Sequence, residues 1–292
     1  MVDAAIGHIQ SDRTSKDLPL TKQFTMSKDV RLESVQPLTL RSGPVKLSDR
    51  LGGDDKFYRL QLRQRSSFNL KLRSFGANAD VELIQDRDGD GRAELGETIA
   101  SSRASEGLDA IDIQGLSAGT YYLRILPKSD DEMRYRLRLS AAPTQTTSAA
   151  YEVVQLTNAY RESKGLPALA VNTQLTKAAQ AYARSLAIDD NWSHTGADGS
   201  SPWDRIEAAG YNYSQAAENL AAGHKTAASA VKGWINSPGH RRNLLAYQVQ
   251  EIGVGYFVLT PDQGRVTFGS YWSQSMGTPI DVRVEPNVPD GD

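Results

Sequence analysis

Short segments between residues 31 and 140 alternate apolar and polar side chains with a period of two. The alternating apolar positions are Tyr58, Leu60 and Leu62, then Phe68, Leu70 and Leu72, then Ile111 and Ile113, and finally Tyr135, Leu137 and Leu139. This period is typical of strands that bury one face, and turn-forming stretches such as GGDD at 52–55 and PKSDD at 127–131 separate the segments. Many short strands at this spacing predict an antiparallel β-sandwich over residues 31–140.

The pattern becomes helical after residue 150, because apolar side chains now recur every three or four positions. Four helices are predicted. The first has Val153, Leu156 and Tyr160 on one face, the second is capped by Asn172 or Thr173, the third begins at Ser201-Pro202, and the fourth covers 226–236. Two strands follow, over 251–260 and 264–274, and a turn at 261–264 joins them. Helices followed by a terminal hairpin predict an α+β domain.

Three stretches without a sustained period mark the ends of the chain and the boundary between the two domains. Residues 1–30 are polar and are predicted to be disordered. The stretch AAPTQTTSA at 141–149 has neither charge nor a large apolar side chain and is predicted to be a linker. A second domain then covers 150–277, and residues 278–292 form a loose acidic tail. The predicted fold class is therefore α+β, with an N-terminal antiparallel β-sandwich and a second domain of helices and strands.

Composition excludes several classes of protein. The 292 residues include 33 Lys and Arg against 35 Asp and Glu, and a net charge of −2 argues against a general nucleic-acid binder. No apolar run reaches the roughly 18 residues that a membrane-spanning helix needs. The absence of cysteine excludes disulfides and thiolate metal ligands. No secretory signal is visible at residues 1–17, since no basic region is followed by an apolar stretch.

The segment DRDGDGRAELGE at 86–97 has the spacing of a calcium-binding loop. Carboxylates at its first, third and fifth positions can converge on one hard cation, the seventh offers a backbone carbonyl, and the twelfth can bind through both oxygens. The predicted calcium ligands are Asp86, Asp88, Asp90, Arg92 and Glu97. The flanking VELI and ETIA are typical of strands, so the loop is predicted to stabilise the sandwich rather than to form an EF-hand. The alternative is a solvated acidic turn.

Four separated segments of the second domain resemble the CAP superfamily, also called the SCP or pathogenesis-related-1 family, in its bacterial branch. They are WSHTGADGSSPWDRI at 192–206, AENLAAG at 217–223, WINSPGHRRNLL at 234–245 and EIGVGYF at 251–257. The resemblance implies that residues 150–277 form an α-β-α sandwich, the CAP fold, with a central cavity.

The same resemblance implies that His194, Glu218 and His240 line this cavity. In several family members such residues hold a divalent metal, and two imidazoles with one carboxylate form a three-ligand zinc set that leaves a position for water. Many eukaryotic members carry a second Glu shortly after the tryptophan of the fourth helix. Here Trp234 is followed by Ile235 and Asn236, so that acid is missing and a four-residue site is in doubt.

Residues 35–140 resemble the pre-peptidase C-terminal (PPC-like) β-sandwich, an accessory module of secreted bacterial proteins. The resembling segments are 79–91, 116–126 and 135–141. Both resemblances imply a bacterial protein of the extracellular space or cell envelope.

Three functions follow as competing hypotheses. The first is a binding or interaction module with a calcium-stabilised sandwich. In this hypothesis the cavity of the CAP domain binds a metal or a ligand, which is a lipid, a glycan or a protein. The second is a zinc-assisted hydrolase of peptide, lipid or cell-wall material, which needs an open coordination position. The third is a structural adhesin without chemistry. Whether the protein is an enzyme, and its oligomeric state, are left open because fold-level resemblance does not separate these functions.

Overall fold

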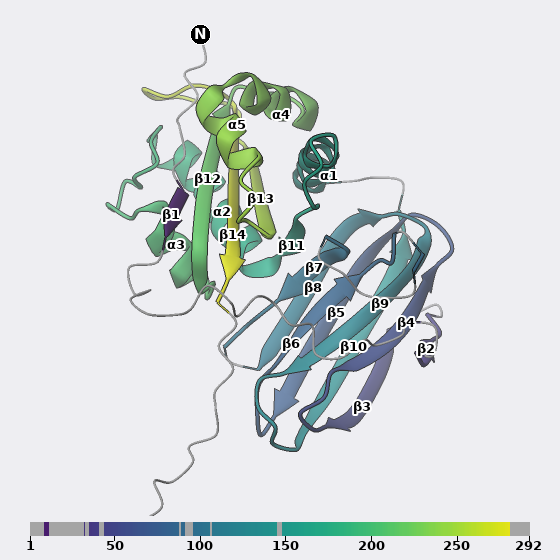
Figure 1. Ribbon diagram of the computed structural model, residues 1–292. Helices are drawn as coiled ribbons and strands as arrows, with labels where there is room; N and C mark the ends of the chain where they lie inside the picture. The colour runs from purple at the N-terminus through teal and green to yellow at the C-terminus, as the bar shows by residue number, and fades with distance from the viewer. Residues whose placement is uncertain are drawn as a thin grey trace, which may run out of the picture.

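The computed structural model describes residues 9–11, 32, 35–40, 44–87, 89–90, 96–105, 107–144 and 148–280. It confirms the α+β fold class: a β-sandwich precedes a domain of helices and strands (Figure 1). The described strands form one four-stranded sheet and one ten-stranded sheet.

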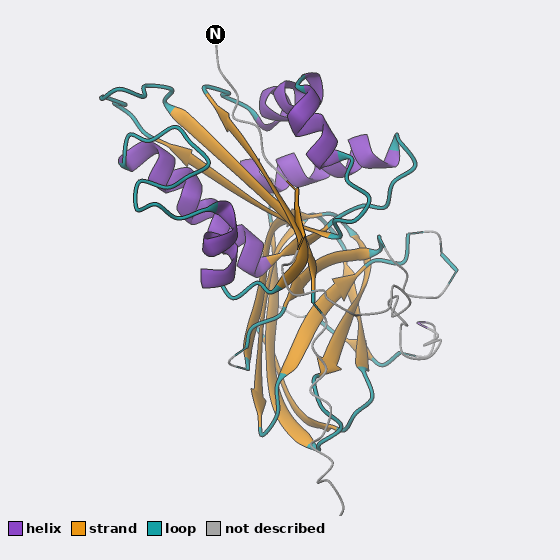
Figure 2. Ribbon diagram, turned by 60° about the vertical axis from the view of Figure 1, so that its left-hand side comes forward, coloured by secondary structure: helices purple, strands orange, loops and turns teal. Residues whose placement is uncertain are grey.

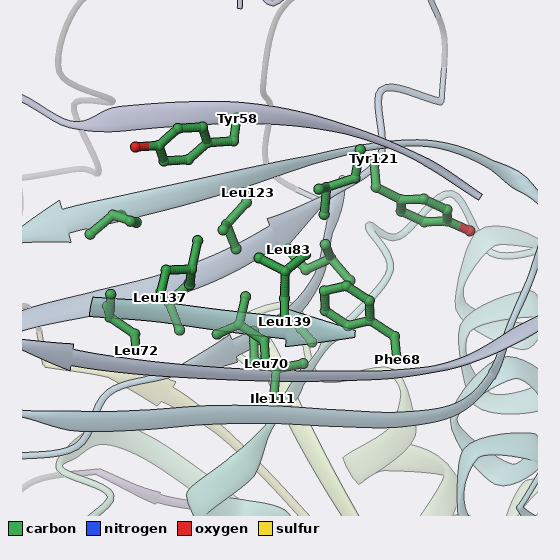
Figure 3. Packing of buried hydrophobic residues seen from close by; sticks show 14 of the residues in the cluster. Tyr58, Phe68, Leu70, Leu72, Leu83, Ile111, Tyr121, Leu123, Leu137 and Leu139 are labelled. Atoms are coloured by element: carbon green, nitrogen blue, oxygen red, sulfur yellow. The ribbon is translucent and has the colours of Figure 1, made fainter. Parts of the chain in front are cut away.

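The four-stranded sheet is one layer of the sandwich. In spatial order its strands are β3 (Val45–Leu51), β10 (Met133–Pro143), β5 (Ser66–Phe75) and β8 (Leu108–Leu116). All its pairings are antiparallel. The other layer belongs to the larger sheet, and the alternating apolar side chains of both layers form one buried core (Figure 3). The positions that alternate in the sequence are therefore the positions that are buried.

The ten-stranded sheet runs through both halves of the molecule. In spatial order its strands are β1 (Ile9–Ser11), β12 (Tyr213–Ala222), β14 (Ser270–Pro279), β13 (Glu251–Val258), β11 (Ala170–Asn172), β7 (Thr98–Ser102), β6 (Ala79–Ile84), β9 (Gly119–Pro127), β4 (Lys56–Leu62) and β2 (Pro37–Leu38). The edge strand β2 pairs in parallel with β4, so the sandwich is not antiparallel throughout.

Helices cover both faces of the C-terminal part of this sheet, as Figure 2 shows. They are α1 (Ala149–Glu162), α2 (Thr173–Ile188), α3 (Pro202–Ala208), α4 (Ala227–Asn236) and α5 (Pro238–Leu244). One face packs against α2, and the other packs against α1, α4 and α5. The result is the expected α-β-α layering. None of the described helices has the length and apolar character needed to cross a bilayer.

The terminal hairpin of the structure differs from the predicted one in its second strand. Strand β14 begins at Ser270 rather than at residue 264 and continues to Pro279, so a long connection replaces the predicted turn at 261–264. The backbone N–H groups of Arg265 and Val266 donate to the carboxylate of Asp190, which follows α2. The side chains of Val266 and Phe268 pack beside α2. Their alternation with polar residues resembles that of a strand, which explains why the sequence predicted one here.

The structure also bears on the predicted boundaries. Within 1–30, Ile9–Ser11 form strand β1, which pairs with β12, and the other residues lie outside the described part of the chain. In the predicted linker, β10 extends to Pro143 and α1 begins at Ala149, with 145–147 outside the described residues. In the predicted tail, residues 278–279 belong to β14 and 281–292 lie outside.

Backbone hydrogen bonds between strands join the two domains directly. Strand β11 pairs in parallel with β13 on one side and with β7 of the sandwich on the other. Beside this seam the Arg103 guanidinium contacts Glu82 at 2.8 Å and Glu251 of β13 at 3.4 Å. Glu251 also accepts hydrogen bonds from Ser101 and Asn172, one from each domain. A buried ion-pair network therefore joins the domains.

Two glycines allow α2 to lie directly on β13. A Cβ at Gly253 would lie 2.1 Å from the backbone of Leu175, and a Cβ at Gly255 would lie 2.2 Å from the carbonyl oxygen of Ala179. No rotamer change relieves these clashes because the opposing atoms are backbone. The glycines of the EIGVGYF segment are thus required by close helix–sheet packing.

We expect Gly253→Ala to destabilise the protein by about 1–3 kcal/mol or more, because α2 must move away from β13. The change is measured from the urea unfolding midpoint. Gly52→Ala is the matched control, since a Cβ there meets nothing within 4 Å. Equal midpoints for the two variants would contradict this account of the helix–sheet contact.

Candidate functional site

His194 lies in the loop between α2 and α3, and side chains of both helices hold its backbone. The Tyr182 hydroxyl of α2 donates to the carbonyl of Ser193 at 2.6 Å. The Arg205 guanidinium of α3 donates to the carbonyl of His194 at 3.0 Å. The imidazole is partly exposed, with 21% of its side chain accessible. The loop is therefore fixed although it has no regular structure.

Glu218 lies in the middle of β12 and is buried. Its Oε1 is 2.6 Å from Nδ1 of His194. Because a carboxylate can only accept, Nδ1 of His194 is the donor in this contact. Sequence and structure thus agree that His194 and Glu218 lie together.

Arg205 is the member of the site that was missed in the sequence. It donates to Glu218 Oε2 at 3.0 Å and to Oε1 at 3.3 Å. Its guanidinium lies over the Tyr182 ring, 3.3 Å from the centroid. Arginines are common on helices, and neither periodicity nor spacing distinguishes this one. The ion pair neutralises the buried carboxylate, and the aromatic face stabilises the cation.

His240 lies on α5 and is completely buried. Its burial, and secondarily the nearby His194, lower the pKa of His240 to about 4, so the imidazole is neutral. Neither of its ring nitrogens has a hydrogen-bond partner within the protein, and the same holds for Nε2 of His194. The two imidazoles therefore retain unused polar atoms in a buried setting.

An amide network holds α5 against β12. Asn243 donates to the backbone carbonyl of Glu218 at 3.2 Å and to the side-chain oxygen of Asn219 at 3.0 Å. Asn219 in turn donates to Gln274 of β14 at 2.9 Å, and Gln274 donates to Thr157 of α1 at 3.1 Å. The asparagines of the AENL and HRRNLL segments thus position the strand and helix that carry Glu218 and His240.

The expected three-ligand metal set is not found in this form. Among the described residues, no group of three or more His, Asp or Glu side chains is arranged to hold a metal ion. The unpartnered nitrogens of the two histidines are chemically suited as donors to a cation. Glu218 fits less well, because Arg205 and His194 already engage both of its oxygens.

The acidic loop lies between β6 and β7, as its flanks predicted. Of the predicted calcium ligands, Asp86, Asp90 and Glu97 are described, whereas Asp88 and Arg92 lie outside the described residues. The N–H of Gly89 donates to Asp86 at 2.7 Å, and the N–H of Arg87 donates to Glu97 at 2.7 Å.

Arg87 and Gly96, near the two ends of the 86–97 segment, lie against the second domain. The Arg87 side chain contacts Glu162 of α1 at 2.8 Å. A Cβ at Gly96 would lie 3.2 Å from Pro167, in the connection between α1 and β11.

Comparison with known proteins supports the resemblance of the second domain. Residues 154–275 match the protein family described as Cysteine-rich secretory protein family (CAP), and this range includes all four segments that predicted it. The chain is 36% identical over 135 residues to the uncharacterized protein YkwD of Bacillus subtilis, covering 46% of this chain and 49% of YkwD. The chain therefore spans about half the length of that relative.

Two solved structures are similar at lower levels. An extracellular protein of Bacillus anthracis that contains a SCP domain is 24% identical, with a TM-score of 0.40 over 50% of this chain and 52% of that one. The pre-peptidase C-terminal domain of a Bacillus anthracis collagenase is 14% identical, with a TM-score of 0.31 over 36% of this chain and 94% of that domain.

We expect acid to destabilise the protein through His240. The pKa of His240 is about 4 in the folded state, below the ordinary value of 6.5. Between these pH values the imidazole is protonated in the unfolded chain but not in the folded protein. The free energy of unfolding should therefore fall as the pH decreases from about 6.5 towards 4, by up to about 1.4 kcal/mol per pH unit.

The test compares the free energy of unfolding of the wild type with that of His240→Gln, which lacks this titration. Both are measured by urea unfolding in the presence of EDTA at pH values from about 6.5 to 4. The stability difference between the two proteins should change with pH, and contributions from all other groups cancel from it. Parallel pH profiles would show that His240 is not a buried neutral imidazole.

Proposed function

We propose that this chain, whose residues 154–275 form a CAP domain, is a bacterial binding protein of the extracellular space or cell envelope. The description of the matched family as secretory supports the location. In this proposal the CAP domain binds a ligand, and it does not catalyse hydrolysis.

The state of Glu218 is the observation that carries the proposal. A zinc-assisted hydrolase needs a carboxylate that either binds the metal or takes a proton from the attacking water. Arg205 and His194 already donate to the oxygens of Glu218, and the side chain is buried. A carboxylate engaged in this way orients its neighbours and does not also hold a water for attack.

We also propose that the two imidazoles bind a divalent cation such as zinc. Nε2 of His194 and a ring nitrogen of His240 are the donors in this proposal, and Glu218 fixes the orientation of His194 through its Nδ1 proton. Two protein donors leave further coordination positions for a ligand from outside the chain. A bound zinc ion would supply a Lewis acid at this point.

Zinc content and hydrolysis together test the function. We expect the full-length protein to retain close to one equivalent of zinc after dialysis, measured by mass spectrometry. His240→Ala should lose it, whereas His224→Ala, which removes an imidazole outside the cluster, should keep it. Peptide, phospholipid and peptidoglycan substrates should not be turned over. Zinc-dependent turnover that is abolished by Glu218→Gln would overturn the binding proposal in favour of the hydrolase.

We further propose that the loop at 86–97 binds calcium and stabilises the sandwich. The support is its spacing of carboxylates, which repel one another without a cation, and its position between two strands of the core. The contacts of the loop with Glu162 and Pro167 extend this stabilisation to the CAP domain.

Calcium should raise the free energy of unfolding by about 2.7 kcal/mol at a concentration a hundredfold above its dissociation constant. The increase appears as a higher melting temperature and is reversed by EGTA. Asp90→Asn should abolish it, whereas Asp112→Asn, an exposed change on β8, should not. A melting temperature that does not respond to calcium would identify the loop as a solvated acidic turn.

A further inference from the structure

The outer face of the four-stranded sheet carries a dense set of cations. Inward side chains of β3, β10 and β5 alternate with exposed ones, and the exposed positions of neighbouring strands are in register. The cations on this face are Lys46 and Arg50 of β3, Lys71 and Arg73 of β5, and Arg134, Arg136 and Arg138 of β10. We refer to this set as the cationic face.

Like charges lie directly opposite one another across these strands. Arg136 is paired with Arg73, and Arg138 is flanked by Lys71 and Lys46. Opposed like charges destabilise a sheet, so folding alone does not favour this arrangement. The chain as a whole has a net charge of −2, which makes the local excess of cations more distinctive.

Acidic side chains border the cationic face but do not balance it. Glu132 contacts Arg50 at 2.5 Å, and Asp49 contacts Lys56 of β4 at 3.5 Å. Asp112 lies on β8, where Gln114 donates to it. The positions that oppose Arg136 and Arg138 in the register carry no carboxylate.

One end of the face is hollowed into a groove of about 480 Å³. Arg50, Arg134, Arg136 and Phe75 are among the residues that line it. The guanidinium carbons of Arg73 and Arg136 lie 5.2 and 5.3 Å from the centre of the Phe75 ring. The aromatic ring therefore supports the two guanidiniums, and their N–H groups remain available to an anion.

The geometry points to a linear phosphate-bearing polymer without bases as the partner: we propose that it lies in the groove and along the cationic face. Arginine forks match phosphate oxygens in pairs, and successive exposed positions along a strand lie roughly 6–7 Å apart. A groove accommodates a chain better than it accommodates a plane.

Two other polyanionic partners fit less well. Proteins that bind single-stranded nucleic acid combine a cationic groove with aromatic rings on which bases stack, but Phe75 is engaged with guanidiniums, and the Tyr135 hydroxyl is buried against Tyr58. A membrane surface needs an apolar patch to insert. On this face Leu108, at 57%, is the large apolar side chain that is exposed among the described residues, and Phe75 is half-buried beneath two guanidiniums.

Long-chain sodium polyphosphate is the probe, and its affinity for the full-length protein is measured by calorimetry at several salt concentrations. Arg136→Gln combined with Arg138→Gln should weaken binding at least about tenfold and lower the slope of log K against log salt by about 1.4, since each lost contact contributes about 0.7. The melting temperature should stay the same or rise, because opposed like charges are removed.

The matched control is Lys177→Gln combined with Arg184→Gln, which removes two exposed charges from α2. This control should bind polyphosphate as the wild type does. An equal loss in both double variants would overturn the proposal, because binding would then follow net charge alone. Tighter binding to single-stranded DNA or to phosphatidylglycerol vesicles than to polyphosphate would also overturn it. The outcome is independent of the CAP site, since none of the changed residues contacts it.

Discussion

The parallel pairing of β11 with β7 is the constraint on which the rest of the structure depends. It joins the sheet of the CAP domain to one layer of the sandwich, and the Arg103–Glu251 ion pair lies beside the seam. Glu251, Ser101 and Asn172 are buried, so separating the domains would break their hydrogen bonds together with the Arg103–Glu251 ion pair. The ten-stranded sheet therefore acts as one element. Arg87 and Gly96, near the ends of the 86–97 segment, lie beside Glu162 and Pro167 of the second domain.

The CAP site shows how one residue changes the chemistry of a recognised motif. His194 and Glu218 are in direct contact, and His240 is close enough to His194 for the latter to lower its pKa. That the three line a common cavity stays a prediction. Arg205 converts the carboxylate from a candidate ligand into the anionic half of an ion pair. What remains available is Nε2 of His194 and the two ring nitrogens of His240, which have no hydrogen-bond partner within the protein. The proposed binding of a cation uses these nitrogens and leaves Glu218 in its ion pair.

The sequence predicted those parts of the fold that depend on local patterns. Alternation located the buried side chains of β4, β5, β8 and β10, and capping residues located α2 and α3. The helix predicted over 226–236 corresponds to α4. The parts that it did not predict depend on distant partners. Strand β12 is buried along most of its length and shows no alternation, and α5 is too short for a helical period. The edge strand β1 and the β11–β7 seam are defined by pairing across the chain, and Arg205 gains its role only when α3 packs over Glu218.

The continuous sheet also fixes where the two binding surfaces lie relative to each other. The cationic face belongs to the four-stranded layer, whereas the CAP domain extends from the ten-stranded layer on the other side of the sandwich core. The four-stranded layer meets the CAP domain at its edge strand β8, where the Thr173 hydroxyl of α2 donates to the carbonyl of Ala110 at 2.7 Å. The cations of the cationic face lie on β3, β10 and β5, on the outward side of that layer. If both proposals hold, the polymer and the CAP ligand occupy different parts of one rigid sheet assembly, so the two binding events do not compete for space.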